Sequence, residues 1–286
     1  MSGLSPGTLA EALEARAAHP EAVPIAGGTD LMVAVNFGRL RPDSLLDLSG
    51  VAELARWERR NGSLRIGAGA TFAQIARDLG EFPPLVQAAR TVGSPQIRNR
   101  ATIGGNLGTA SPAGDALPVL AAYDGEVLLA STRSERRLRW DEFLLGPKRS
   151  ALAADELIVG VEWPLVDGPG SFAKVGTRNA MVIAIANVAL VLDVVARSVR
   201  VALGSVGPTV LRAPEAEAYA AEALDWDDPQ RPLPGQTAAE FGVLAAAAAS
   251  PIDDVRGTAA YRRHAVGVLA RRALQWAVAD RAEVPA

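Results

Sequence analysis

The chain has no cysteine among its 286 residues and only two histidines, His19 and His264. Without cysteine it has no disulfide, no thiolate nucleophile, no zinc–thiolate site and no cysteine-ligated iron–sulfur cluster. Both histidines lie in segments with helical periodicity, where a surface or packing role is the ordinary one. No G-x-S-x-G motif accompanies them, which argues against a Ser-His-Asp triad. These absences predict that the protein has no metal site and no catalytic side chain. Any chemistry would therefore be supplied by a bound cofactor.

The sequence also lacks a long uninterrupted apolar run and an excess of basic residues. Its longest apolar stretch, from Met181 to Val195, is broken by Asn187 and Asp193, short of the roughly 20 apolar residues that a membrane span needs. The net charge of −3 and the pI near 5.6 offer no basic surface for nucleic acid. The first residues do not show a basic region followed by an apolar one. We therefore expect a cytoplasmic protein with no nucleic acid partner and no membrane span.

Strand and helix patterns alternate in the first part of the chain. Residues 8–19 have helical periodicity up to Pro20, and residues 22–28 form a strand that ends in a turn. Extended segments follow at 43–51 and 62–70. The second leads into a helix that is expected to have Thr71 as its N-cap and to end at Gly80. Such alternation predicts an α/β arrangement.

The second part of the chain has longer apolar runs. Strands are expected at 126–132 and 155–165, an apolar helix from about Ile183 to Leu192, and further helices at 214–223, 237–249 and 258–278. The Gly and Pro residues in the segment from Pro164 to Gly170 mark the best domain boundary.

One glycine motif mimics a dinucleotide-binding fingerprint. "GAGATF", residues 67–72, follows a strand and opens a helix, but Phe72 occupies the position of the third glycine. No strand ending in an acidic residue follows about 20 residues later. A tight turn into a capped helix explains the motif instead.

Two other glycine clusters, "AGGTD" at 26–30 and "TIGGN" at 102–106, combine adjacent glycines with a hydroxyl and a small polar side chain. Exposed backbone N–H groups in such loops suit phosphate oxygens. Neither cluster has a Walker lysine, which argues against a nucleoside triphosphate. Each glycine pair taken singly is compatible with an ordinary turn or with tight packing at a strand end. Together they favour two loops that divide a diphosphate between them.

Three longer stretches carry a resemblance to a known family: "PIAGGTDL", "QIRNRATIGGNLGTASPAGDALPVLAA" and "FAKVGTRNAMVIAIANVAL". They resemble the FAD-binding medium subunits of the molybdenum hydroxylases, of the xanthine dehydrogenase and carbon monoxide dehydrogenase type. The resemblance extends from about residue 5 to about residue 277. It implies an α+β fold, with an FAD-binding domain of the vanillyl-alcohol-oxidase (PCMH) type at 1–166, divided into subdomains at about 1–55 and 56–166. A C-terminal α/β flavoprotein domain at 171–278 would cover the flavin.

The resemblance also implies which residues hold FAD. Two segments would surround the diphosphate: Pro24, Ile25, Ala26, Gly27, Gly28, Thr29, Asp30 and Leu31, and Thr102, Ile103, Gly104, Gly105 and Asn106. Asp115 would accept hydrogen bonds from FAD hydroxyls, Ile158 would lie against the isoalloxazine, and Lys174 would lie near its polar edge. Without the family, Asp115 reads as a turn or helix-capping residue, Ile158 as core and Lys174 as a solvated strand residue. Arg178 is a further correspondence. Val92 departs from the family, because some members have a larger aromatic residue near the ring at this position.

The implied function is electron transfer. In the family a large subunit with a molybdenum cofactor oxidises substrate, a small subunit with two [2Fe–2S] clusters relays electrons, and FAD passes them to NAD+, a quinone, oxygen or another acceptor. A chain without cysteine provides only the FAD step and needs both partners. Two alternatives stay open, a stand-alone FAD-dependent oxidoreductase that acts directly on a small molecule, and a non-catalytic scaffold that has lost FAD.

Overall fold

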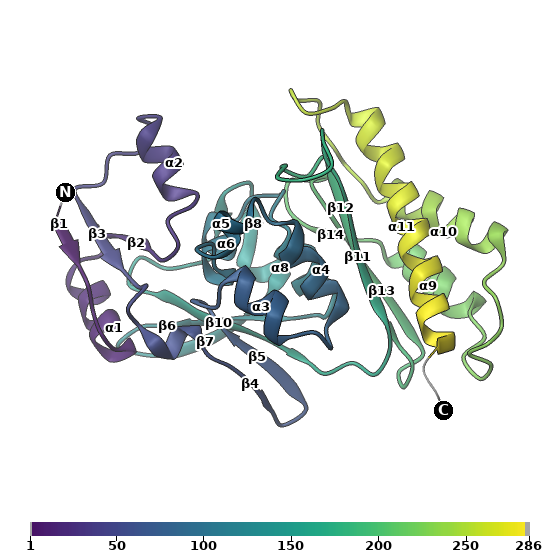
Figure 1. Cartoon of the computed structure of the whole chain (residues 1–286), viewed down its shortest axis with the longest axis horizontal. Helices are drawn as coiled ribbons and strands as arrows, with labels where there is room; N and C mark the ends of the chain where they lie inside the picture. Colours follow the sequence, from purple (N-terminus) through teal and green to yellow (C-terminus); the bar gives the residue numbers. More distant parts are fainter. Residues whose placement is uncertain (1, 284–286) are drawn as a thin grey trace.

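The computed structural model describes residues 2–283, which form three larger sheets arranged in chain order along the long axis of the molecule, with helices between them (Figure 1). Helices pack against each sheet, because each sheet has an apolar face that must be buried. The arrangement is a mixture of parallel and antiparallel sheets with helices, as the resemblance implied.

The N-terminal sheet is parallel, with strand order β1-β3-β2. Its elements are β1 (Ser2–Leu4), α1 (Leu9–Ala18), β2 (Val23–Ile25), α2 (Leu31–Asn36) and β3 (Ser44–Asp47). Thr8 and Glu11 form a capping box at the start of α1, which satisfies two of the free N–H groups of its first turn. The apolar run from Leu31 to Val35, which by composition suits a buried strand, forms the short helix α2 instead, with Met32 and Val33 exposed.

The central sheet is antiparallel, with strand order β4-β5-β10-β6-β7. Its strands are β4 (Trp57–Arg60), β5 (Ser63–Gly67), β6 (Glu126–Ala130), β7 (Glu135–Arg139) and β10 (Leu157–Pro164). Between them come η1 (Ala52–Ala55), α3 (Phe72–Asp78), α4 (Pro83–Thr91), α5 (Pro95–Arg98), α6 (Ile103–Thr109), α7 (Ala116–Ala122), α8 (Trp140–Phe143) and the hairpin β8 (Leu144–Gly146) and β9 (Arg149–Ser150). The expected cap at Thr71 is confirmed, since its side chain accepts a hydrogen bond from the Gln74 N–H.

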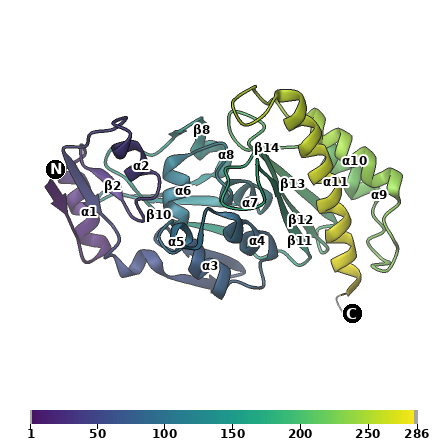
Figure 2. The same ribbon diagram turned by 45° about the horizontal axis from the view of Figure 1, so that its top comes forward.

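The C-terminal sheet is antiparallel, with strand order β11-β12-β13-β14. Its elements are β11 (Gly170–Val175), β12 (Ala186–Asp193), β13 (Ser198–Gly204), β14 (Leu211–Arg212), α9 (Pro214–Ala223), α10 (Gly235–Ala247) and α11 (Ala259–Glu283). Figures 1 and 2 show α4 on the face toward the central sheet and α11 with α10 on the opposite face, and Figure 2 shows α7 beside α4. The sheet is therefore covered on both sides.

The predicted helix from about Ile183 to Leu192 is wrong, because most of that segment is β12. Residues 186–192 are buried without alternation, since β12 is a central strand with helices over both faces. A short apolar run of this kind has no period that separates a buried strand from a buried helix. The helices expected at 214–223, 237–249 and 258–278 are present as α9, α10 and α11.

One hydrophobic core joins the central and C-terminal sheets. Leu85 of α4 and Leu117 of α7 belong to the same buried cluster as Phe172 of β11 and Val191 of β12. Burial of each such side chain contributes about 1.5–3 kcal/mol, so the two parts of the chain stabilise each other. The face of the C-terminal sheet that carries Lys174 is thereby held against α7.

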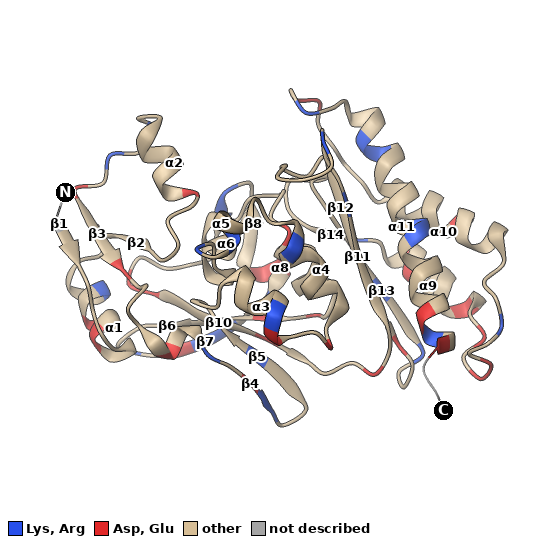
Figure 3. Cartoon of the chain, in the orientation of Figure 1, with Lys and Arg blue, Asp and Glu red and all other residues tan. Residues whose placement is uncertain are grey.

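Charged residues of both signs are interspersed along the ribbon (Figure 3). Many are paired, for example Arg136 with Glu156 and Arg137 with Glu162. Within residues 2–283, no helix has the length and apolar character required to cross a membrane.

Candidate functional site

Helix α6 is the element around which the predicted site residues gather. The structure corrects the expectation of a loop at "TIGGN", because Thr102 is the N-cap and Ile103 to Asn106 form the first turn of α6. Thr102 Oγ1 accepts a hydrogen bond from the Gly105 N–H at 3.0 Å, as a threonine N-cap does. The Gly104 N–H donates to the Ala68 carbonyl at 2.8 Å, so the "GAGATF" turn serves as a support for α6.

Glycine stands at the four positions of the two clusters for different physical reasons. A Cβ on Gly27 would lie 1.9 Å from the Arg100 carbonyl oxygen, and one on Gly104 would lie 2.6 Å from Ala68 Cβ. Close packing within the protein therefore requires these two glycines. Gly28 has φ +73°, a conformation that disfavours side chains. Gly105 is exposed, and a Cβ there would meet only Thr102 Oγ1, at 3.1 Å, so Gly105 is the glycine that leaves open space for a ligand.

The structure brings the two glycine clusters together. Asp30, the residue before α2, accepts a hydrogen bond on Oδ2 from Thr109 Oγ1 of α6 at 3.1 Å. Gly27 also packs closely against the backbone of Arg100, which lies just before the second glycine cluster, so the two clusters are joined at a second point. Residues 24–29 are half-buried, which leaves part of each accessible beside α6.

Asp115 lies at the start of α7, but its side chain makes no capping hydrogen bond. Its carboxylate reaches across to the C-terminal sheet. Oδ2 accepts from Lys174 Nζ at 2.6 Å, and Oδ1 accepts from Asn187 Nδ2 at 3.0 Å. The geometry rejects the turn-cap alternative and makes Asp115 a link between two parts of the chain.

Lys174 is not the solvated strand residue that its position in β11 suggests. The side chains of Lys174 and Asp115 are each 7% exposed, and Lys174 Nζ also donates to the Thr91 carbonyl at 3.2 Å. Burial raises the pKa of the Asp115 carboxyl above its ordinary value, while the Lys174 ammonium and the Asn187 amide oppose that rise. An ammonium has three N–H donors, and Asp115 and Thr91 use two of them, so the third is available to a ligand acceptor.

Ile158 and Asn106 connect α6 to the neighbouring elements. Ile158, on β10 beside a register shift, is 8% exposed, and its Cδ1 lies 3.7 Å from the Cβ position of Gly108 in α6. Asn106 Oδ1 is buried without a hydrogen-bond partner among the described residues and lies 2.9 Å from the Cβ position of Gly114. The α6 surface is therefore continuous with the turn that carries Asp115.

Two further predicted positions are outside this group. Arg178 donates to the carbonyls of Ala180 and Met181 in its own loop. Val92 is the C-cap of α4 and packs partly buried against the core, one residue after Thr91.

Asn187 and Thr109 were missed in the sequence. Asn187 is recognisable as the polar residue that interrupts an apolar run, which is the available signal. Thr109, one turn after Gly105, has no such signal, because its partner Asp30 is 79 positions away.

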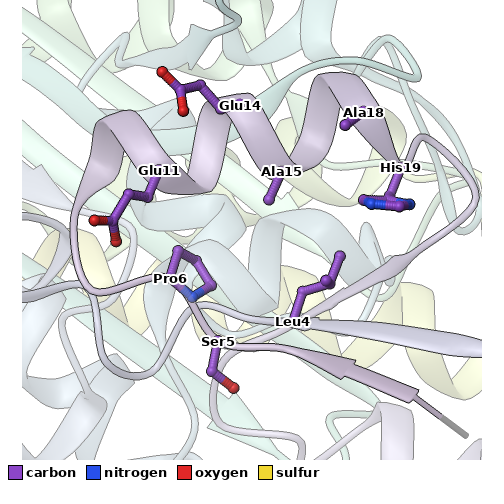
Figure 4. Close-up of a pocket in the computed structure, with 8 residues that line it drawn as sticks. All are labelled: Leu4, Ser5, Pro6, Glu11, Glu14, Ala15, Ala18 and His19. Carbon is purple, nitrogen blue, oxygen red and sulfur yellow. The ribbon is translucent and has the colours of Figure 1, made fainter.

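A separate hollow lies between β1 and α1, and its lining includes Pro6, Glu11, Glu14 and His19 (Figure 4). The Glu11 carboxylate accepts hydrogen bonds from the N–H groups of Gly7 and Thr8, and no glycine pair lines the hollow. The hollow therefore lacks the glycine clusters that mark the α6 region.

Among residues 2–283, no group of three or more histidine and acidic side chains is placed to hold a metal ion.

Comparison with known proteins assigns the chain to a family. Residues 1–166 match the FAD binding domain in molybdopterin dehydrogenase, and residues 171–277 match the CO dehydrogenase flavoprotein C-terminal domain. The chain is 33% identical over 278 residues to the nicotine 6-hydroxylase medium subunit of Paenarthrobacter nicotinovorans, which covers 94% of both chains. It is 31% identical over 283 residues to the xanthine dehydrogenase FAD-binding subunit of Escherichia coli O157:H7, covering 95% of this chain and 94% of that one.

Solved structures agree with this assignment. A chain of quinoline 2-oxidoreductase from Pseudomonas putida 86 matches with a TM-score of 0.89 and 26% identity, covering 99% of this chain and 98% of the other. A chain of carbon monoxide dehydrogenase from Hydrogenophaga pseudoflava matches with a TM-score of 0.86, also at 26% identity and with 98% of both chains covered.

The chain belongs to the FAD-binding subunits of the molybdenum hydroxylases. It is an FAD-dependent oxidoreductase subunit of the xanthine dehydrogenase and CO dehydrogenase type, and its cofactor is FAD. The residues present fit that cofactor, because the open face of Gly105 leaves room for a ligand beside α6 and the unpartnered Asn106 Oδ1 offers an acceptor of the kind that an FAD hydroxyl or N–H needs.

Proposed function

We propose that this protein is the electron-transfer subunit of a hetero-oligomeric molybdenum hydroxylase, in which bound FAD takes electrons from [2Fe–2S] clusters in a small subunit and delivers them to NAD+, a quinone, oxygen or another acceptor. The small subunit would receive them from a large subunit with the molybdenum cofactor. Relatives named as medium subunits support this assignment, as does the absence of cysteine, because the chain has no thiolates for a cluster of its own. The cytoplasmic location stays a prediction.

The observation that carries the proposal for the site is the grouping of both glycine clusters, Asp115 and Lys174 around α6. Pro24 to Leu31 and Thr102 to Asn106 would line the space for the diphosphate. The N–H groups from Ile103 to Asn106 donate within the protein, so the backbone N–H groups of the first segment would be the donors to phosphate. The glycines would hold the backbone close to the anion, Gly105 by its open face and Gly28 by its left-handed conformation. Asn106 Oδ1 is an acceptor without a partner among the described residues, so it would serve a hydroxyl or N–H group of FAD and not the phosphate oxygens.

The remaining residues would orient the ring system and the sugar chain. Asp115 would accept hydrogen bonds from hydroxyls, Ile158 would provide an apolar contact, and Lys174 would donate its third N–H to the polar edge of the ring. The protein supplies orientation and hydrogen bonding, while the redox chemistry is that of the flavin.

The first test is to purify the full chain alone, record its absorption spectrum and identify any cofactor by acid release and chromatography. We expect FAD in near-equimolar amount. A colourless protein that also fails to take up added FAD would contradict the site and the function together.

The second test concerns the partners. Genes for a molybdenum-cofactor large subunit and a [2Fe–2S] small subunit are expected near the gene for this chain, and co-expression of the three should give a complex that contains FAD, iron and molybdenum. An FAD-loaded chain that has neither neighbour and oxidises a small molecule unaided would instead support a stand-alone flavoenzyme.

A further inference from the structure

Asn187 is an unusual residue for its position in β12. It is completely buried in a strand whose neighbouring positions are apolar. Its Nδ2 donates to Asp115, but its Oδ1 is buried and has no hydrogen-bond partner among the described residues. A buried amide with an unpaired acceptor costs free energy that an apolar side chain at this position would not. Stability of the sheet therefore does not account for the asparagine.

The sheet places Asn187 between two residues that make its contact possible. In the register of the strands, Asn187 is opposite Lys174 of β11 and opposite Gly204 of β13. A Cβ on Gly204 would lie 2.0 Å from Asn187 Oδ1. Glycine at this position therefore leaves the room that the amide occupies, and the amide then reaches Asp115 at the start of α7.

Because Asn187 contacts Asp115, each oxygen of the Asp115 carboxylate has a different partner from the C-terminal sheet. Oδ1 accepts from Asn187 and Oδ2 accepts from Lys174. Rotation of the carboxylate about its Cβ–Cγ bond would break at least one of these hydrogen bonds. We propose that Asn187 is a positioning residue for the cofactor site, which holds the Asp115 carboxylate in the orientation that serves Lys174 and the ligand together.

This inference rests on the proposed FAD site. The groups that face Asp115 are Lys174 from β11, Asn187 from β12 and Thr91 from α4, and Lys174 is the charged one. Without Asn187, the ionised carboxylate has one hydrogen-bond donor fewer and becomes easier to protonate. A protonated or rotated Asp115 no longer accepts from two ligand hydroxyls, and Lys174 loses its counter-charge.

The test uses the full chain stripped of FAD, with FAD as the probe. The dissociation constant is measured by quenching of flavin fluorescence over a pH series for the wild type and for Asn187→Leu. We expect the variant to bind FAD roughly 10- to 100-fold more weakly, the range for losing a hydrogen bond to a charged group. The loss of affinity on acidification should also begin at a higher pH in the variant.

Two further variants separate positioning from damage to the sheet. Ser171→Ala removes another buried hydrogen bond of the same sheet, from Ser171 Oγ to the Ala273 carbonyl at 3.1 Å, and should lower the melting temperature without changing FAD affinity or its pH profile. Gly204→Ala should displace the Asn187 amide and, like Asn187→Leu, weaken FAD binding. If circular dichroism shows that Asn187→Leu does not fold, Gly204→Ala tests the positioning role of Asn187 in its place.

Unchanged FAD affinity and an unchanged pH profile in folded Asn187→Leu, or the same losses in Ser171→Ala, would overturn the positioning role. Failure of the wild type to bind FAD would instead overturn the proposed site. Weaker binding in Asp115→Ala together with normal binding in Asn187→Leu would leave the site intact and remove Asn187 from it.

Discussion

Asp115 Oδ2 and Lys174 Nζ lie 2.6 Å apart in a nearly dry environment, although the two residues are 59 positions apart in the sequence. Asp115 precedes α7, and Lys174 is on β11 of the C-terminal sheet. The pair joins the two parts of the chain at the point where Asn187 and Thr91 also converge. A buried ion pair is strongly sensitive to the loss of one partner, because the other charge is left uncompensated.

Replacement of Asp115 by alanine should weaken FAD binding by about 1–3 kcal/mol, the range for losing a charged hydrogen-bond partner. Flavin fluorescence titration measures this change. Thermal unfolding of the FAD-free protein gives the separate cost of leaving Lys174 buried without a counter-charge. Unchanged FAD affinity would remove Asp115 from the site.

Replacement of Gly105 by valine should prevent FAD uptake while the fold persists, because the side chain would project into the open space beside the first turn of α6. Gly80→Val is a matched control, since a Cβ on Gly80 has no heavy atom within 4 Å and Gly80 is outside the site. Flavin content after purification and circular dichroism are the two readouts. A Gly105→Val protein with normal FAD content would reject the diphosphate assignment. Gly28→Val should also lose FAD, but its positive φ adds backbone strain to the effect.

Glu156→Gln should make the protein less stable at neutral pH by about 1 kcal/mol. Hydrogen bonds from Arg136, assisted by the Ala153 N–H, hold the pKa of the Glu156 carboxyl below its ordinary value of 4.5. A lowered pKa in the folded state means that the stabilisation is present above pH 4.5 and is lost as the pH falls through the folded-state pKa.

The free-energy difference between wild type and Glu156→Gln should therefore shrink on acidification, as measured by urea unfolding over a pH series. Asp155→Asn is the control, because its partner Arg133 is exposed and such surface pairs contribute little. An equal difference at all pH values would show that the charge of Glu156 is not responsible.

Arg262→Met should lower the free energy of unfolding by about 3 kcal/mol, because two buried carbonyls would lose their charged donor. Arg262 is 3% exposed and donates to the carbonyls of Ile185 and Ser205, at 2.7 and 2.9 Å, and to Asp254. The neighbouring exposed Arg263→Met should change stability by less than about 0.5 kcal/mol. Similar losses for both variants in chemical unfolding would contradict the special role of Arg262.

Much of the secondary structure followed from local signals. Thr71 and Gly80 predicted the ends of α3 to within two residues, because a hydroxyl N-cap and a terminal glycine act within one turn. The prediction failed at β12, where burial on both faces removes the alternation that identifies a strand. It also failed at "TIGGN", because two adjacent glycines in a first helical turn have the composition of a loop.

The sequence by itself excluded cysteine chemistry. It also contained the two glycine clusters and the resemblance that led to FAD. These conclusions depend on residue types and short spacings, which can be read directly from the amino-acid sequence. Folding decided which glycines meet protein backbone and which leave open space, and it brought Asp115, Lys174 and Asn187 into contact. Those outcomes depend on the packing of α7 against the C-terminal sheet, and contacts between distant segments leave no local pattern in a single sequence.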